Sequence, residues 1–312
     1  MIVKQLKRQG KQCVTVTLPE LLQLSNGARQ FTLSASRFNN AQSGSHLSRF
    51  LSRGMEFAEC RRYQAGDDIR TIDWRVTART GKPHTKLFSV EKERPVLLCV
   101  DMRSPMFFAT QGVFKSVQAA LITGYIAWNA VQTGNRLGGM IFNDATLFEY
   151  RPALGKRGVL PFLQGLAERA HFPSLKKGQT PGSMEGMLNH AISNLRRVAA
   201  PGSLIFIVSD FRHFSSLSRD LLLQLSKHND LCLCFAYDPL EATLPSNGSY
   251  PVTDGNIELQ FNTNDKKRVE KYHRQFIERK ANVKSLCNQR HIHFLECSTA
   301  SDCFELLKMH FR

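Results

Sequence analysis

Short apolar runs that alternate with helical patterns constrain this chain more than any other feature. The runs predicted as strands lie at residues 96–101, 136–142, 203–210, 231–237 and 291–296, with a hairpin through 250–261. The stretches predicted as helices lie at 113–131, 159–170, 183–198, 217–227 and 265–289, with a further helix at the C-terminus. Strands that are apolar on both faces and separated by helices predict a mostly parallel, three-layer α/β sheet.

The first 94 residues follow a different pattern. Residues 18–24 fit a short helix, whereas residues 54–94 mix β-like segments with turn sequences at 65–68 and 80–83. We therefore predict a small β-rich N-terminal lobe at residues 1–94 and an α/β domain at residues 95–312.

The excess positive charge is concentrated in two regions. The 312-residue chain has 42 Lys and Arg against 26 Asp and Glu, a formal net charge of +16. Residues 1–94 carry 17 basic and 8 acidic side chains, and residues 265–290 carry 9 and 3, so the rest of the chain is nearly neutral. A chain this basic is drawn to an anionic partner, which the total charge alone does not identify.

The helix predicted at 265–289 has an apolar seam on one side and cations on the other. This basic face is either simply solvated or docks an acidic partner or a polyanion. Nucleic acid is the weaker alternative, because no zinc finger, RNA-recognition aromatics or KH loop accompanies the helix. The cations assigned to the face are Lys266, Lys267, Arg268, Lys271 and Arg274.

We expect a cytoplasmic protein without a transmembrane segment. The early lysines are not followed by the apolar core of a signal peptide. The longest apolar runs are shorter than the roughly 20 residues that a spanning helix needs. The eight cysteines are dispersed, and Cys232 and Cys234 lie within an apolar run, which predicts reduced core side chains.

Motifs of catalysis are missing from the sequence. The nucleophile-elbow, zinc-protease, phosphate-loop and dinucleotide-binding patterns are all absent. His291 and His293 share one face of a predicted strand, but no other metal ligand is tied to them by spacing. We predict no catalytic residues and no enzymatic activity.

One dense motif lies between residues 54 and 96. Its residues are Gly54, Glu56, Phe57, Arg61, Tyr63, Gly66, Asp67, Asp68, Arg70, Ile72, Asp73, Trp74, Ala78, Arg79, Glu91 and Pro95. This motif resembles the signature of the bacterial domain-of-unknown-function-58 family. The remainder of the chain resembles the von Willebrand factor A-like domain that follows this signature in the family, so the resemblance implies a Rossmann-like α/β fold.

Domains of the von Willebrand A type often hold a divalent metal through an Asp, two Ser, a Thr and a second Asp. The matching positions here are Asp101, Arg103, Pro105, Ser183 and Asp210. Arg103 and Pro105 replace the two serine ligands, and a guanidinium is permanently cationic. We therefore expect no metal and no other cofactor, with Arg103 paired to Asp101 or Asp210 in the metal's place.

The polar residues of the signature lobe have two interpretations. Ion pairs, with Trp74 as a large apolar anchor, could simply fix a β-rich lobe against the α/β domain, or the same residues could bind a partner. The residues assigned to this candidate binding site are Arg61, Tyr63, Asp67, Asp68, Arg70, Asp73, Trp74, Arg75 and Arg79.

The resemblance implies a partner as well as a fold. Members of the family are commonly linked with MoxR-type AAA+ ATPases that assemble or mature other proteins. We expect a non-enzymatic adaptor or scaffold that works with such an ATPase and its client proteins. The alternative is a basic module that docks on nucleic acid or on an anionic membrane surface.

Overall fold

The chain forms two compact units, each described here by itself. The computed structural model describes residues 11–31, 33, 55–64, 67–90, 94–171, 184–244, 248–253, 258–290 and 292–311. One unit comprises residues 42–93, which we call the signature lobe, and the other, the α/β unit, comprises residues 1–41 together with 94–312.

A six-stranded sheet forms the centre of the α/β unit. Its strand order is β10-β7-β6-β3-β4-β5, and every neighbouring pair is parallel except β4 with β5. The prediction of a mostly parallel α/β sheet is therefore confirmed. The strands are β3 (Val96–Asp101), β4 (Arg136–Phe142), β5 (Leu147–Leu154), β6 (Leu204–Ser209), β7 (Asp230–Tyr237) and β10 (His293–Ser298).

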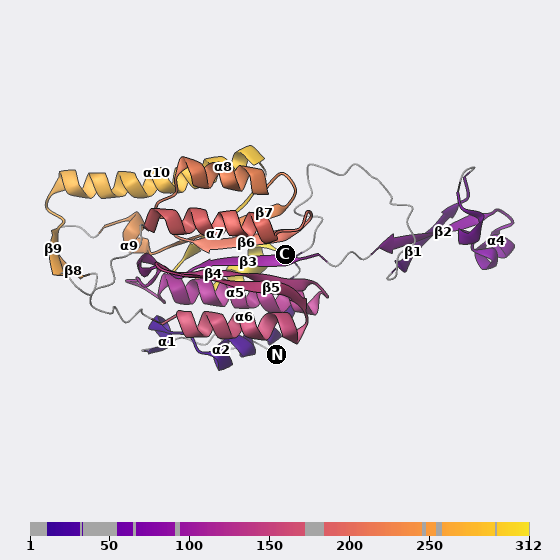
Figure 1. Cartoon of the computed structure of the whole chain (residues 1–312), viewed down its shortest axis with the longest axis horizontal. Coiled ribbons are helices and arrows are strands. Elements are labelled where there is room, and N and C mark those ends of the chain that lie inside the picture. The colour runs from indigo at the N-terminus through magenta and orange to yellow at the C-terminus, as the bar shows by residue number, and fades with distance from the viewer. Residues whose placement is uncertain are drawn as a thin grey trace. The chain divides into compact units, whose positions relative to one another are not determined.

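Helices cover both faces of this sheet (Figure 1). On β3, Val96, Leu98 and Val100 face a core shared with α5 and α6, while Leu97 and Cys99 face a core shared with α7, α8 and α10. This alternation explains why the strand is apolar at every position. The helices are α5 (Lys115–Gln132), α6 (Lys156–Arg169), α7 (Met184–Val198), α8 (Ser216–Leu225), α9 (Pro239–Ala242), α10 (Lys266–Arg290) and α11 (Cys303–His310).

Strand β5 has no counterpart among the predicted strands. Its sequence alternates exposed Glu149 and Arg151 with half-buried residues and contains Pro152, so it lacks the uniform apolar run of its neighbours. It lies antiparallel at one edge of the sheet. Charged residues and a proline are tolerated there because an edge strand pairs on one side only.

The N-terminal segment departs from the predicted domain division. Helix α2 (Leu18–Gln23) and the short helical turns η1 (Leu24–Asn26) and η2 (Ala28–Gln30) pack on α5, and α2 also contacts α6. Residues 11–31 therefore belong to the α/β unit and not to the lobe in which the sequence placed them. The apolar side of this segment, including fully buried Leu21, completes the core below α5 and α6.

Two side chains of α5 fasten this segment. Trp128 Nε1 donates to the Leu21 carbonyl at 2.9 Å. Asn129, only 2% exposed, donates through its amide to the carbonyls of Ala28 at 2.7 Å and Phe31 at 2.6 Å. Its carbonyl accepts from the Leu33 backbone at 3.4 Å, so it satisfies buried backbone groups that have left regular structure.

Arg94 is the first residue of the second chain segment, residues 94–312, of the α/β unit. Its backbone N–H donates to Asn135 Oδ1 at 3.0 Å, and its guanidinium donates to the Gly202 carbonyl at 2.8 Å and pairs with Asp230. The predicted boundary at residue 94 thus coincides with an anchored residue.

The signature lobe contains an antiparallel pair of strands, β1 (Met55–Arg62) and β2 (His84–Val90). The connection between them carries the turn η3 (Ile69–Thr71) and the helix α4 (Trp74–Thr80). The Tyr63 backbone N–H donates to the Pro83 carbonyl at 2.9 Å, and that of Asp73 donates to the His84 carbonyl at 2.8 Å. The predicted hairpin near residues 250–261 is present as β8 (Ser249–Thr253) and β9 (Glu258–Asn262).

Replacing Asn129 with Leu tests the fastening of the N-terminal segment. The variant keeps the side-chain size but leaves buried backbone groups unsatisfied, so we expect a loss of about 3 kcal/mol in the free energy of unfolding. Urea unfolding measures this loss, and limited proteolysis should show faster cleavage within residues 11–31. The control is Gln132→Leu, which removes an exposed hydrogen bond to the Ser25 carbonyl and should cost less than about 1 kcal/mol. Equal losses in the two variants would contradict the assignment.

Candidate functional site

Two aspartates meet at the carboxyl edge of the central strands. Asp101 is the last residue of β3, and Asp210 follows the last residue of β6, the strand paired beside it. From β3 the chain crosses through α5 on one face of the sheet, whereas from β6 it crosses through α8 on the other face. The two strands therefore flank a topological switch point, the position at which open α/β sheets bind ligands.

Arg103 occupies this position and pairs with Asp101. Its Nη2 lies 2.6 Å from Asp101 Oδ2, and its Nε lies 3.0 Å from Oδ1. Ser209 Oγ also donates to Asp101 Oδ2 at 2.6 Å. The side chains of Arg103 and Asp101 are 1% and 0% exposed. The predicted pairing of Arg103 in this site is thus observed, with Asp101 as its main partner and Asp210 at 3.9 Å.

Asp210 is neutralised by cations from two further elements. Lys115 Nζ, from the first residue of α5, lies 3.1 Å from Asp210 Oδ2 and 3.0 Å from Glu241 Oε1 of α9. Arg212 Nη2 lies 2.8 Å from the same Glu241 oxygen, and its Nε lies 3.4 Å from Asp210 Oδ2. Lys115 and Asp210 are fully buried, and the Arg212 side chain is 36% exposed.

These six side chains form a charge-balanced group, which we call the ion cluster. Its members are Asp101, Asp210, Glu241, Arg103, Lys115 and Arg212. Three carboxylates face three cations, so their charges sum to zero. Burial of unpaired charges is very costly, and reciprocal pairing with hydrogen bonds is what allows these groups to remain in the interior.

Pairing shifts the pKa values of Asp210 and Arg103 in opposite directions. Burial alone would raise the pKa of Asp210, but Lys115 and then Arg212 hold it well below its ordinary value. Burial alone would lower the pKa of Arg103, but the Asp101 carboxylate raises it. Both groups are therefore charged at neutral pH. The depressed pKa of Asp210 contributes stability that is present above about pH 4 and is lost as the pH falls toward its folded value.

The loop that follows Asp210 is strained and is hydrogen-bonded to the ion cluster. Phe211 and His213 have positive φ angles of 51° and 63°, which residues with side chains adopt infrequently. The Phe211 N–H donates to Ser209 Oγ at 2.9 Å. The Arg103 guanidinium donates to the Arg212 carbonyl through Nη1 and Nη2, each at 3.3 Å. Besides balancing its own charges, the cluster therefore holds the backbone of this strained loop through hydrogen bonds.

The residues at this site do not fit a divalent metal. Both carboxylate oxygens of Asp101 accept hydrogen bonds from Arg103, and the guanidinium would repel a cation. Pro105 lies in the turn η4 (Ser104–Met106) and has no hydroxyl, while the neighbouring Ser104 donates to Asp144 instead. Ser183, the proposed counterpart of the Thr ligand, lies outside the described residues. Among the described residues, no group of three or more His, Cys, Asp or Glu side chains is placed to hold a metal ion.

Three members of the ion cluster were missed by sequence reasoning. Lys115, Arg212 and Glu241 are separated by up to 126 residues in the chain, and none belongs to the metal-site pattern that drew attention to Asp101. Asp238 was missed as well. It follows β7 and accepts from Thr110 Oγ1 at 2.6 Å and Thr299 Oγ1 at 2.7 Å. The one signal in the sequence was that Asp238, like Asp210, directly follows an apolar strand, just as Asp101 ends one.

The three aspartates of the signature lobe bind other groups of the same lobe. Asp67 pairs with Arg61 at 2.7 Å, and Tyr63 Oη donates to the Asp67 carbonyl at 3.2 Å. The Asp68 carboxylate caps η3 through the Arg70 N–H. That of Asp73 caps α4 through two backbone N–H groups. These contacts give the three carboxylates local structural roles within the lobe.

Trp74 does not serve as an apolar anchor within the signature lobe itself. Its side chain is 68% exposed, because it lies at the start of α4 on the side that faces solvent. Arg70, Arg75 and Arg79 are also exposed, and within the described part of the chain their side chains form no ion pair. The signature residues Gly54, Gly66 and Glu91 lie outside the described residues.

The predicted basic face is present on α10. Phe276, Val283 and Leu286 are buried, as the apolar seam required, while Lys267, Arg268, Lys271 and Arg274 are exposed. Arg268 lies 3.1 Å from Asp265, three residues earlier in the chain. The side chain of Lys266, the first residue of α10, is not among those that the structure describes.

The two histidines noted in the sequence give no metal site that can be described. His291 lies outside the described residues, and the ring of His293 packs against that of His310 with centroids 6.1 Å apart.

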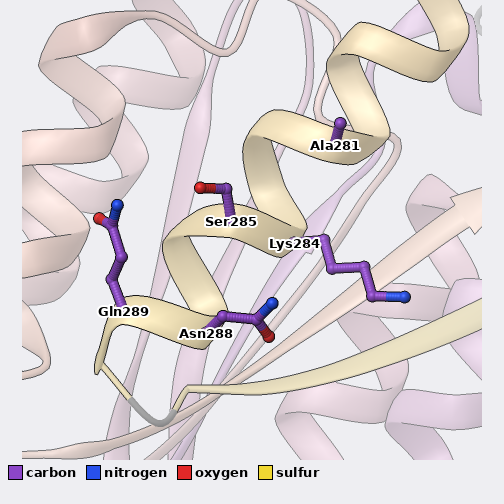
Figure 2. A pocket seen from close by; sticks show the side chains of 5 residues that line it. All are labelled: Ala281, Lys284, Ser285, Asn288 and Gln289. Atoms are coloured by element: carbon purple, nitrogen blue, oxygen red, sulfur yellow. The ribbon is translucent and has the colours of Figure 1, made fainter.

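Two hollows on the surface of the described residues are not lined by a catalytic group of side chains. One follows the C-terminal half of α10, and Figure 2 shows that all five of its lining side chains come from this single helix. Its lining residues are Ala281, Lys284, Ser285, Asn288 and Gln289. A second hollow lies between β5 and α7 and is lined by Glu149, Arg151, Arg197 and Val198. Neither includes a member of the ion cluster.

Comparison with known proteins identifies a family without an assigned activity. Residues 59–282 match the model of the family described as "Protein of unknown function DUF58". Uncharacterized proteins of Mycobacterium bovis and Mycobacterium tuberculosis are 31% identical to this chain over 211 residues. This alignment covers 68% of the chain and 64% of the length of each relative, so somewhat less than two thirds of those proteins is matched.

Two crystal structures show a weaker likeness. The conserved hypothetical protein BatB from Bacteroides thetaiotaomicron is 8% identical with a TM-score of 0.43, over 69% of this chain and 96% of that one. An aerotolerance-related membrane protein from Bacteroides fragilis is 9% identical with a TM-score of 0.42, over 70% and 96%. Within the described part of this chain, no helix combines the length and apolar character needed to cross a membrane.

Replacing Arg103 with Met tests how strongly the fold depends on the ion cluster. The variant leaves Asp101 buried without its main cation, so we expect a loss of about 3–5 kcal/mol in the free energy of unfolding at neutral pH. Chemical denaturation measures it. The matched control is Arg212→Met. Because the Arg212 side chain is partly exposed, water can solvate the carboxylates that this variant leaves unpaired, so its loss of free energy of unfolding should be smaller. Adding Asp101→Asn to Arg103→Met should recover part of the loss. A stable Arg103→Met variant would show that the pair is dispensable.

Proposed function

Because the chain belongs to the DUF58 family, whose function is unknown, we propose a role from its site: a non-enzymatic adaptor or scaffold that binds other proteins. One observation carries the proposal. The switch point of the sheet, where an α/β enzyme would hold its ligand, is filled by the chain's own Arg103 and Lys115. Asp101 and Asp210 are both paired with cations, which supports a role that does not use them as a nucleophile or a general base.

The proposal extends to the fold family and to the partner. We propose that the α/β unit is a von Willebrand A-like domain in which Arg103 substitutes for a metal. A fixed internal cation would make such a domain independent of metal supply. We further propose that the partner is a MoxR-type AAA+ ATPase acting with client proteins in the assembly or maturation of complexes. The resemblance of the signature between Gly54 and Pro95 supports this choice of partner.

Metal independence predicts an absence of thermal stabilisation by divalent ions. Millimolar Mg²⁺ or Mn²⁺ should leave the melting temperature of the wild type unchanged relative to a chelator, whereas a ligand at 100 times its Kd adds about 2.7 kcal/mol. The control is the double variant Arg103→Ser with Pro105→Ser, which supplies two hydroxyls and removes the cation, and which Mg²⁺ should stabilise. Manganese located by anomalous scattering between Asp101 and Asp210 in wild-type crystals would refute the proposal.

The adaptor role predicts a discrete complex with an AAA+ ATPase from the same genome. Size-exclusion chromatography of the two purified proteins, with and without ATP, should show co-elution that persists at moderate salt. The contrasting candidate is binding to nucleic acid or an anionic membrane, which the exposed Lys267, Lys271 and Arg274 of α10 favour. It predicts retention on heparin or anionic vesicles that collapses between about 50 and 200 mM salt. Retention of that kind without an ATPase complex would replace the adaptor proposal.

A further inference from the structure

Helix α4 of the signature lobe has an exposed face of mixed apolar and cationic character. At 100° per residue, Trp74, Arg75, Ala78 and Arg79 fall within one sector of the helix, and all four are exposed. Val76 and Thr77, on the other side, are half-buried. The preceding turn η3 adds Ile69, which is 65% exposed. We call this surface the α4 face; Figure 1 shows α4 beside the strand pair of its lobe.

Trp74 and the arginines beside it have the composition of a protein-binding surface. Trp and Arg are the residues that most often dominate binding energy at protein interfaces, because they combine large apolar area with directed polar groups. Isolated exposed apolar residues are common, but here Trp74 and Ile69 lie within six residues of one another and are followed by arginines. The combination is typical of a contact surface.

The charge of the lobe is unbalanced at this face. Residues 60–85 contain six basic and three acidic side chains. The three acids are committed elsewhere: Asp67 pairs with Arg61, and Asp68 and Asp73 cap the starts of η3 and α4. By contrast, Arg75 and Arg79 form no side-chain hydrogen bond or ion pair within the described part of the chain. The α4 face therefore presents cations that the described side chains of the lobe do not neutralise.

We infer that the α4 face binds an acidic protein segment that carries an apolar side chain. Arg75 and Arg79 would pair with its carboxylates, for which the planar guanidinium is suited, and the apolar side chain would cover Trp74. This inference rests on the proposed protein-binding function and adds the chemical class of the bound segment.

A single-stranded nucleic acid suits this surface less well. Binding of that kind uses several aromatic side chains on which successive bases stack. In the described part of the lobe with placed side chains, the other tyrosine or tryptophan is Tyr63, which is half-buried and donates to the Asp67 carbonyl. One exposed ring offers a contact for an apolar side chain and does not form a stacking track.

Tryptophan fluorescence of the full chain tests the inference. The protein has two tryptophans, and Trp128 is half-buried and bound to the Leu21 carbonyl. The emission of the wild type minus that of Trp74→Phe therefore isolates Trp74. The probe is a short synthetic peptide of glutamates with two interspersed leucines. We expect a blue shift of the Trp74 emission as the peptide covers the ring, and no shift with a matched peptide in which lysine replaces every glutamate.

Variants then assign the binding to the α4 face. Anisotropy of the labelled acidic peptide should show affinity reduced at least about tenfold in Trp74→Ala. We expect a reduction of about two- to fivefold in Arg75→Gln. Arg157→Gln, the same charge change at an exposed position of α6, should leave the affinity unchanged.

Three results would overturn the inference: a Trp74 emission already blue-shifted in the free protein, a shift with a short oligothymidylate but not with the acidic peptide, or equal losses in Arg75→Gln and Arg157→Gln. Failure of the adaptor proposal is distinguishable from these results. In that case the peptide would bind the α4 face while no complex with an AAA+ ATPase forms.

Discussion

The buried pair between Arg103 and Asp101 is the interaction on which the centre of this molecule depends. Ser209, the last residue of β6, donates to the same Asp101 carboxylate, so the pair is linked to the ends of both β3 and β6 at the switch point of the sheet. The Arg103 guanidinium also binds the Arg212 carbonyl and so supports a loop with two positive φ angles. Because each partner would be very costly to bury alone, the pair, the strand ends and the loop form as one unit.

The sequence predicted the sheet and its main site because both rest on local signals. Uniform apolar runs identified the central strands, and Arg103 was singled out because it stands two residues after Asp101, where the von Willebrand A pattern that the chain resembles has a serine. Strand β5 was missed, because an edge strand with charged residues and Pro152 lacks that signal. Lys115 and Glu241 were missed for a different reason: they reach Asp210 from elements far apart in the chain, and only the packed sheet brings them together.

The signature lobe shows how one motif can serve two purposes. Its aspartates are satisfied by local backbone N–H groups and by Arg61, so the motif specifies a compact turn-helix connection between two strands. Its arginines and Trp74 are left outside that network. Sequence reasoning had grouped all of these residues together, because charge alone does not distinguish a capping aspartate from an exposed arginine. The difference lies in the backbone geometry of η3 and α4.

The C-terminal end of α5 fastens backbone segments that are far apart in the chain. Asn129, within the helix, binds the Ala28 and Phe31 carbonyls, and Asn135, just after the helix, accepts from the backbone of Arg94. One end of a single helix therefore organises backbone that precedes the signature lobe in the sequence and backbone that follows it. Damage to that end of α5 would release both stretches at once, so the effect of such a change would extend well beyond the residue that is altered.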